Sequence, residues 1–275
     1  MRGTFAVALV AATTIALAFV ALPLVALFVH TSPGTLVDQL GNPAVTDALV
    51  VSLKTSLVAH ACVLLVGTPA AYVLARRRFP GRAGVLTLVE LPLVLPPAVA
   101  GVALLAAFGR YQLLGGTLHA LGITVGFTQA AVVLAVAFVE SPFYVRGAVA
   151  AFEAVDDDLL AAARTLGAGP ARVFFRVALP LAAGGLAASS ALALARGLGE
   201  FGATIIFAGS LQGVTQTLPL AVYAQFEANF DVALAIGTLF VLAGAALLLL
   251  LKLAPAWTLR SASISPLRPA TSTSA

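Results

Sequence analysis

The amino-acid sequence predicts an all-α polytopic membrane protein with about six transmembrane helices and a structured cytoplasmic loop. Three observations lead to this fold class. Hydrophobic residues make up 61% of the 275 residues and charged residues only 9%, against roughly 25% in a soluble domain. Six apolar runs are long enough to cross a bilayer. The basic residues gather in alternate connections between these runs.

The six expected spans are residues 5–29, 47–75, 84–108, 126–150, 181–207 and 231–251. The first run follows Arg2 as a signal peptide would, but it exceeds the roughly 7–15 residues of a signal-peptide core. We therefore expect a retained first span. Residues 1–45 should supply the first helix and an outer loop, 46–252 the main transmembrane domain, and 253–275, rich in Ser, Thr and Pro, a disordered cytoplasmic tail.

The basic residues predict the orientation of the chain in the cell membrane. Twelve of the fifteen Lys and Arg residues fall on one side: Arg2, Arg76, Arg77, Arg78, Arg82, Arg146, Arg164, Arg172, Arg176, Lys252, Arg260 and Arg268. The loops on the opposite side hold only Arg110. Basic residues favour the cytoplasm, so both termini should lie there. The net charge of +4 comes from these short clusters and not from a basic face with interleaved aromatics, which argues against nucleic acid as a partner.

The connection at residues 151–180 is too long for a simple loop and carries helix signals of its own. Asp156, Asp157 and Asp158 should cap a helix over residues 159–166. Gly167 should end it, and residues 169–170 should turn the chain. Residues 171–177 alternate basic and apolar side chains, as in a second short amphipathic helix before the fifth span.

This loop resembles the EAA loop of ABC importer permeases. The matching residues are Ala162, Ala163, Gly167, Leu179 and Pro180, and Ala161 stands where that family usually has Glu. The resemblance implies a type I ABC importer permease fold, in which this loop is a coupling helix that docks on a separate ATPase subunit. The Ala161 position departs from the family at one expected ATPase contact.

Two segments within the spans bear on a transport path. The prolines of residues 91–97, Pro96 and Pro97 among them, should bend the third span, either as a packing kink or as a lining of the path. In the fifth span Arg196 and Glu200 are four residues apart, so a continuous helix would place them on one face. They should form either a structural ion pair or part of the path or gate.

Residues 196–223 resemble the molybdate permeases of the ABC family, through Gly-Glu-Phe-Gly-Ala-Thr at 199–204 and Thr-Leu-Pro-Leu at 217–220. This resemblance implies a homodimer, two ATPase subunits that use ATP, and a periplasmic or lipid-anchored oxyanion-binding protein, with no cofactor in this chain. Permeases for sulfate, thiosulfate or tungstate are the alternatives within the class.

Other classes of function are less well supported. There is no GxxxxGK[ST] sequence for an ATPase site, and no set of residues for a catalytic or metal site. An ion-coupled secondary transporter would carry ionisable residues deep in several spans. His60 has no carboxylate partner within sequence reach, so we expect it to be a packed polar group. Glu90 and Glu140 should lie near span ends, solvated or paired.

Overall fold

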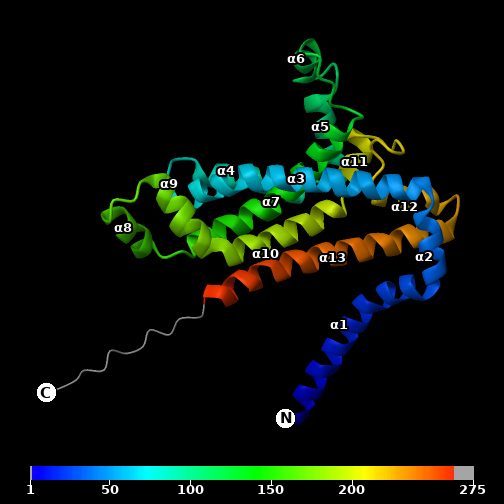
Figure 1. Ribbon diagram of the computed structural model, residues 1–275, viewed down its shortest axis with the longest axis horizontal. Coiled ribbons are helices and arrows are strands. Elements are labelled where there is room, and N and C mark those ends of the chain that lie inside the picture. Colours follow the sequence, from blue (N-terminus) through cyan, green and yellow to red (C-terminus); the bar gives the residue numbers. More distant parts are fainter. Residues whose placement is uncertain (1, 263–275) are drawn as a thin grey trace. The chain divides into compact units, whose positions relative to one another are not determined.

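The computed structural model describes residues 2–262, with side chains described for residues 4–250, and every regular element in this part of the chain is helical. In order, the elements labelled in Figure 1 are α1 (Arg2–His30), α2 (Pro33–Leu40), α3 (Pro43–Arg76), α4 (Arg82–Val94), α5 (Pro97–Phe108), α6 (Gly115–Ala120), α7 (Gln129–Glu153), α8 (Asp157–Thr165), α9 (Pro170–Val173), a π-helical turn (Phe174–Ala178), α10 (Leu179–Leu198), α11 (Gly202–Phe207), α12 (Leu218–Phe226) and α13 (Phe230–Ala262).

Five of the described helices are long and apolar enough to cross a membrane, and the bent pair α4 and α5 makes a sixth if it counts as one span. The expected all-α membrane fold is therefore confirmed. The third span is broken rather than kinked, because the chain leaves the helix at Leu95 and Pro96. Leu95 precedes a proline and is extended, with φ −71° and ψ 128°. A residue before proline is pushed out of the helical region in this way.

The fifth expected span is also interrupted, and here the prediction of one helix over 181–207 is wrong. Helix α10 ends at Leu198, and α11 begins only at Gly202. Glu200 lies in the break, where its Oε1 accepts a hydrogen bond from the Ala203 N–H at 2.7 Å. Arg196 and Glu200 therefore do not share one helix face. Three glycines at 197, 199 and 202 lower the helix propensity of this segment.

The described chain divides into two compact units, which we treat separately. Unit 1 holds the chain up to Thr55, Pro97–Ala135 and Glu200–Ala243, and unit 2 holds Ser56–Pro96, Val136–Gly199 and the chain from Gly244. A core cluster in unit 2 surrounds Phe152, Leu160 and Val173. A cluster in unit 1 brings Val45 and Ala48 of α3 against Leu218 of α12 and Ile236 of α13.

Within unit 1, α5 and α11 approach closely because glycine stands at the contact. A Cβ built on Gly101 would lie 2.9 Å from the Ala203 carbonyl oxygen, and one built on Gly202 would lie 2.5 Å from Pro97 Cβ. Small residues at helix contacts allow this approach in membranes. Helices α5 and α11, which each follow a break in a span, are thereby packed tightly against one another.

The ends of the chain differ from the expected boundaries. Helix α1 exposes its apolar side chains almost throughout, Phe19 for example at 79%. Helix α13 continues to Ala262, past the expected end of the sixth span at residue 251. The remainder of the expected tail, residues 263–275, lies outside the described residues.

Candidate functional site

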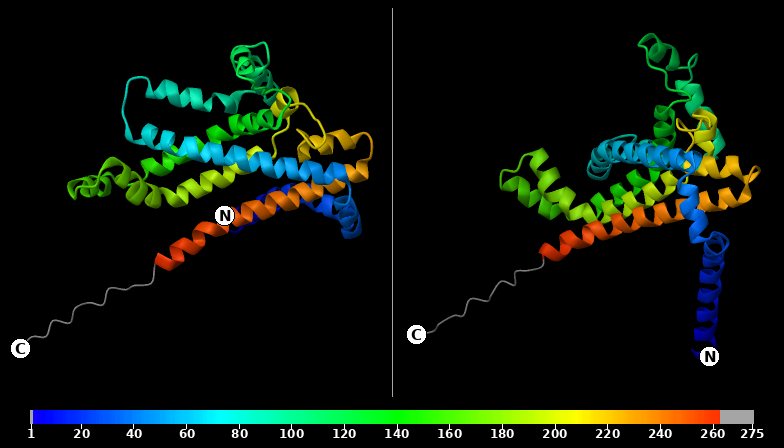
Figure 2. Two further views of the ribbon diagram at one scale, coloured as in Figure 1. Left: turned by 45° about the horizontal axis from the view of Figure 1, so that its top comes forward. Right: turned by 45° about the vertical axis from the view of Figure 1, so that its right-hand side comes forward.

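The long connection between α7 and α10 is built around α8. Asp156 is its N-cap, and its Oδ1 accepts a hydrogen bond from the Asp158 N–H at 2.9 Å. Asp157 and Asp158 fill the first turn and Arg164 the last, which complements the helix dipole at both ends. Figures 1 and 2 show α8 and α9 at one end of unit 2. The acidic start predicted for this helix is confirmed.

Gly167 makes the turn after α8 in the left-handed region, at φ +83°. The Gly167 N–H donates to the Arg164 carbonyl at 2.9 Å, and the Ala168 N–H donates to the Ala163 carbonyl at 3.0 Å. A Cβ at this position would meet nothing within 4 Å. The requirement for glycine is therefore conformational and not steric.

Helix α8 buries Leu160 and exposes a mixture of small, charged and apolar side chains. Leu160 is 1% exposed within the core of unit 2, whereas Leu166 is 87% exposed. Ala161 and Ala162 are exposed as well, and Ala163 is half-buried. The exposed surface therefore has two adjacent small residues, Ala161 and Ala162, between the exposed leucines Leu159 and Leu166.

The second short helix expected after the turn is not separate from the fifth span. Helix α9 passes through the π-helical turn into α10, so that Pro170–Leu198 reads as one candidate span. Pro180 lies in the first turn of α10 and has no N–H to donate to the carbonyl four residues before it. The π-helical turn immediately before accommodates this loss, and there the Leu179 N–H bonds to the Phe174 carbonyl.

Two arginines tie the end of α7 and the start of this connection to the rest of unit 2. Arg76, at the end of α3, donates to Asp157 Oδ1 at 2.6 Å and also to the Phe152 and Val155 carbonyls. Arg82 donates to the Leu74 carbonyl at 2.7 Å and to Glu153 Oε1 at 2.6 Å. In the sequence, these arginines indicate only the membrane topology. In most of these hydrogen bonds the partner is 71 or more residues away in the sequence, so no local sequence pattern predicts the contacts.

A second polar group lies inside the helices of unit 2. The His60 ring nitrogens contact Glu140 Oε1 and, at 2.8 Å, Ser190 Oγ. His60, Glu140 and Ser190 are 7%, 0% and 8% exposed and come from α3, α7 and α10. In the tautomer protonated on Nδ1, the ring donates to the carboxylate and accepts from the hydroxyl. We call these three residues the buried polar cluster.

The buried polar cluster confirms one expectation and corrects part of another. His60 is a packed polar group, and its carboxylate partner, Glu140, lies 80 residues away in the sequence. Glu140 is paired, as one of the two alternatives had it, but it is fully buried in the middle of α7 and not near a span end. Its Oε2 has no hydrogen-bond partner among the described residues. A Cβ on Gly197 would lie 2.7 Å from that oxygen. Glycine at this point of α10 therefore leaves the space that the carboxylate occupies.

The four residues expected in a path or gate are divided between the two units. Pro97 packs against Gly202 at the contact of α5 and α11, and Glu200 caps α11 nearby in the same unit. Arg196 is half-buried in the last turn of α10, and Pro96 lies in the break after α4. In the described part of the chain, no group of three or more His, Cys, Asp or Glu residues could hold a metal ion.

Comparison with known proteins connects this architecture to a family. Residues 65–257 match the family described as binding-protein-dependent transport system inner membrane component. The chain is 45% identical to the molybdenum transport system permease protein ModB of Mycobacterium tuberculosis over 231 residues, which cover 84% of this chain and 88% of the relative. It is 44% identical to ModB of Escherichia coli K12 over 182 residues, covering 66% and 80%.

Solved structures show the same fold. A bacterial ABC transporter involved in the import of alginate matches with a TM-score of 0.65 at 16% identity, over 91% of this chain and 94% of that chain. The MetNI methionine ABC transporter in an inward-facing conformation matches with a TM-score of 0.56 at 22% identity, over 79% and 94%. A binding-protein-dependent system implies an ATPase and a binding protein as partners. The chain therefore belongs to the binding-protein-dependent transport system inner membrane components, as a multi-pass permease component and not as the ATPase.

Proposed function

We propose that this chain is the permease subunit of an ATP-driven importer for molybdate. The observation that carries the proposal is the 45% identity to ModB, which extends over 84% of the chain. Sulfate is the alternative substrate, because the chain is also 34% identical over 206 residues to the sulfate transport system permease protein CysW of Synechococcus elongatus. Both ions are tetrahedral dianions, and tungstate and thiosulfate belong to the same chemical class.

The proposed ATPase contact is the outward face of α8 with the turn that follows it. Ala161, Ala162, Ala163 and Gly167 would form the contact, and Leu179 and Pro180 would join it to the fifth span. The exposed, small-residue surface and the protruding Leu166 support this role. Because α9 continues through the π-helical turn into α10, a push on this loop would be transmitted along the axis of that span.

The clamp by Arg76 supports a second route of transmission. Its guanidinium joins the end of α3 to the Phe152 carbonyl in the last turn of α7, to the Val155 carbonyl just after it, and to Asp157 at the start of α8. The loop would then move as one body with α3 and α7, and with α10, into which it continues, and the ATP cycle of the partner subunit would tilt these three spans together. ATP is used by that partner, and no cofactor is required in this chain.

The proposed path runs between two copies of the chain, with both termini in the cytoplasm and the oxyanion-binding protein on the outer side. Pro96, Pro97, Arg196 and Glu200 are the candidate residues of the path or gate. The breaks at Leu95–Pro96 and after Leu198 support this assignment, because irregular backbone at membrane depth is tolerated where protein or a water-filled cavity satisfies it.

The substrate is tested by uptake in cells that express the chain with its ATPase and binding protein. Labelled molybdate should accumulate, with excess tungstate competing strongly and excess sulfate weakly. Strong competition by sulfate, or accumulation of labelled sulfate at the higher rate, would assign the importer to sulfate. Uptake that survives ATP depletion and stops when the proton gradient is removed would point to a secondary transporter instead.

A further inference from the structure

A pocket in unit 1 has no role in the function proposed so far. It has a volume of about 240 Å³ and lies between the end of α5 and the segment that leads to α7. Its lining residues are Leu105, Phe108, Gly109, Arg110, Gly115, His119, Ile123, Thr124, Val125, Gly126 and Phe127. This is far above the roughly 10–15 Å³ that a cavity needs to hold one water molecule, so a small hydrated ion has room.

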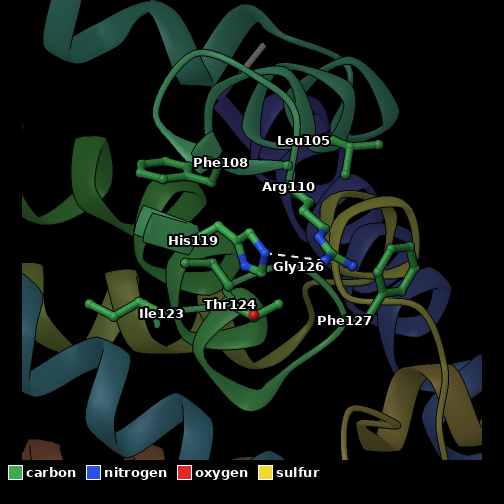
Figure 3. A pocket seen from close by; sticks show the side chains of 11 residues that line it. Leu105, Phe108, Arg110, His119, Ile123, Thr124, Gly126 and Phe127 are labelled. Carbon is green, nitrogen blue, oxygen red and sulfur yellow. Dashed lines mark hydrogen bonds between the residues drawn. The ribbon is translucent and has the colours of Figure 1, made fainter. Parts of the chain in front are cut away.

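Two cationic or hydrogen-bonding side chains meet in this pocket. Arg110 Nη2 donates to His119 Nε2 at 3.1 Å, and the guanidinium also lies 5.4 Å from the centre of the Tyr111 ring. Figure 3 shows Arg110 and His119 pointing toward one another, with the Thr124 hydroxyl beside them in this view. None of the eleven lining residues is acidic. The positive charge of Arg110 therefore meets no carboxylate on the pocket wall.

The backbone holds this arrangement tightly. A Cβ on Gly115 would lie 1.7 Å from the Gly109 carbonyl oxygen. The backbone on either side of the turn that carries Arg110 can therefore approach this closely only because residue 115 is glycine. Phe127 is the only non-glycine residue with positive φ among the described residues, at +59°. Such conformations cost about 1–3 kcal/mol and collect at ligand sites. The pocket wall therefore contains one residue, Phe127, in a costly backbone conformation.

We propose that the Arg110–His119 pocket is a binding site for a tetrahedral oxyanion dianion on the outer face of the protein. A guanidinium offers up to five N–H donors to such an ion, and the imidazole and the Thr124 hydroxyl can add to them. On the predicted topology Arg110 is the one Lys or Arg of the outer loops, so it concentrates the anion where it arrives. This inference rests on the proposed function for the topology and for the class of ion.

The test measures labelling of a cysteine placed in the pocket of the complete transporter in proteoliposomes or cells. Cys62→Ala removes the one native cysteine, and Thr124→Cys introduces the reporter. A negatively charged methanethiosulfonate is added from outside, with sodium molybdate, sodium sulfate or sodium chloride at equal ionic strength. Thr117→Cys, exposed on α6 and outside the pocket, is the matched control, and Ile123→Cys replaces Thr124→Cys if that variant does not fold.

The proposal predicts that molybdate or sulfate slows labelling at Thr124→Cys at least about threefold relative to chloride, and leaves labelling at Thr117→Cys unchanged. Adding Arg110→Gln should remove the protection and slow the basal reaction with the anionic reagent about three- to sixfold, the effect of one charge about 4–6 Å away in water. Arg110→Lys should keep part of both effects.

Equal labelling rates in all salts would overturn the proposal, as would protection that persists in Arg110→Gln. The outcomes remain separable from those of the proposed function. Molybdate uptake without protection at Thr124→Cys rejects the pocket alone. Protection by sulfate in an importer that does not take up molybdate rejects the proposed substrate and supports the oxyanion site.

Discussion

Unit 2 contains two polar groups that both join α3 to α7, in different surroundings. At the end of the unit, Arg76 binds Asp157, whose side chain is 88% exposed, together with two backbone carbonyls. In the middle of the helices, His60 binds Glu140, whose side chain is fully buried. An exposed ion pair contributes about 0–1 kcal/mol, whereas loss of one partner from a buried pair costs about 3–5 kcal/mol. The two groups should therefore respond very differently to substitution.

The largest effect is expected at the buried polar cluster. His60→Ala would leave the Glu140 carboxylate buried without its partner and should lower the free energy of unfolding by about 3–5 kcal/mol. The measurement is denaturation of the purified protein by SDS in mixed micelles. His60→Ala combined with Glu140→Gln should recover a large part of the loss. A double variant whose loss is the sum of the two single losses would show that the residues are not coupled.

Arg76→Ala should come next, at about 2–3 kcal/mol, because it removes charged hydrogen bonds to the Phe152 and Val155 carbonyls. Asp157→Ala is the matched control and should cost no more than about 1 kcal/mol. The same SDS titration measures both. Equal losses for the two variants would mean that the exposed ion pair, and not the carbonyl contacts, holds the loop.

Gly197→Ala tests the wall of the buried polar cluster. Its Cβ would press on Glu140 Oε2 and lie 3.1 Å from Val136 Cγ1, so a loss of about 1–3 kcal/mol is expected. Gly184→Ala on the same helix, where a Cβ meets nothing within 4 Å, should be neutral or slightly stabilising. The SDS titration measures both variants. Equal free energies of unfolding for the two would show that the close approach of α10 to Glu140 does not contribute to stability.

The smallest effect on stability is expected at the turn after α8. Gly167→Ala must adopt φ near +83°, which costs about 1–2 kcal/mol. The melting temperature of the protein should therefore fall by only a few degrees, while the rate of ATP-driven uptake should fall more clearly. A variant with full uptake would show that the left-handed turn is not needed for coupling. Gly169→Ala, whose residue has an ordinary negative φ of −67°, provides the comparison.

Local sequence signals predict the helix of the loop between α7 and α10, but they do not predict the buried polar cluster. The N-cap at Asp156 and the glycine at 167 specify a helix and its end within a dozen residues. His60 is 80 residues from Glu140 and 130 from Ser190, and helical periodicity does not say which faces of distant helices meet. The available signal was a carboxylate inside an apolar span, which requires a partner.

The break after α10 was missed for a different reason. Hydropathy treats residues 181–207 as one apolar run, because glycine and alanine do not interrupt it. The backbone break depends on Glu200 capping α11 and on the fit of Gly202 against Pro97 in unit 1. The break in the third span was easier to anticipate, because Pro96 and Pro97 mark it directly.

The central claim is that this chain is the membrane path of an importer driven by a separate ATPase through the loop at α8. The most direct test reconstitutes the chain with its ATPase and binding protein in liposomes and measures labelled molybdate transport. Transport should require ATP, ignore an imposed proton gradient, and be lost in Gly167→Trp although that variant still inserts into the membrane. Normal transport and normal ATPase co-purification with Gly167→Trp, or transport driven by the gradient alone, would contradict the claim.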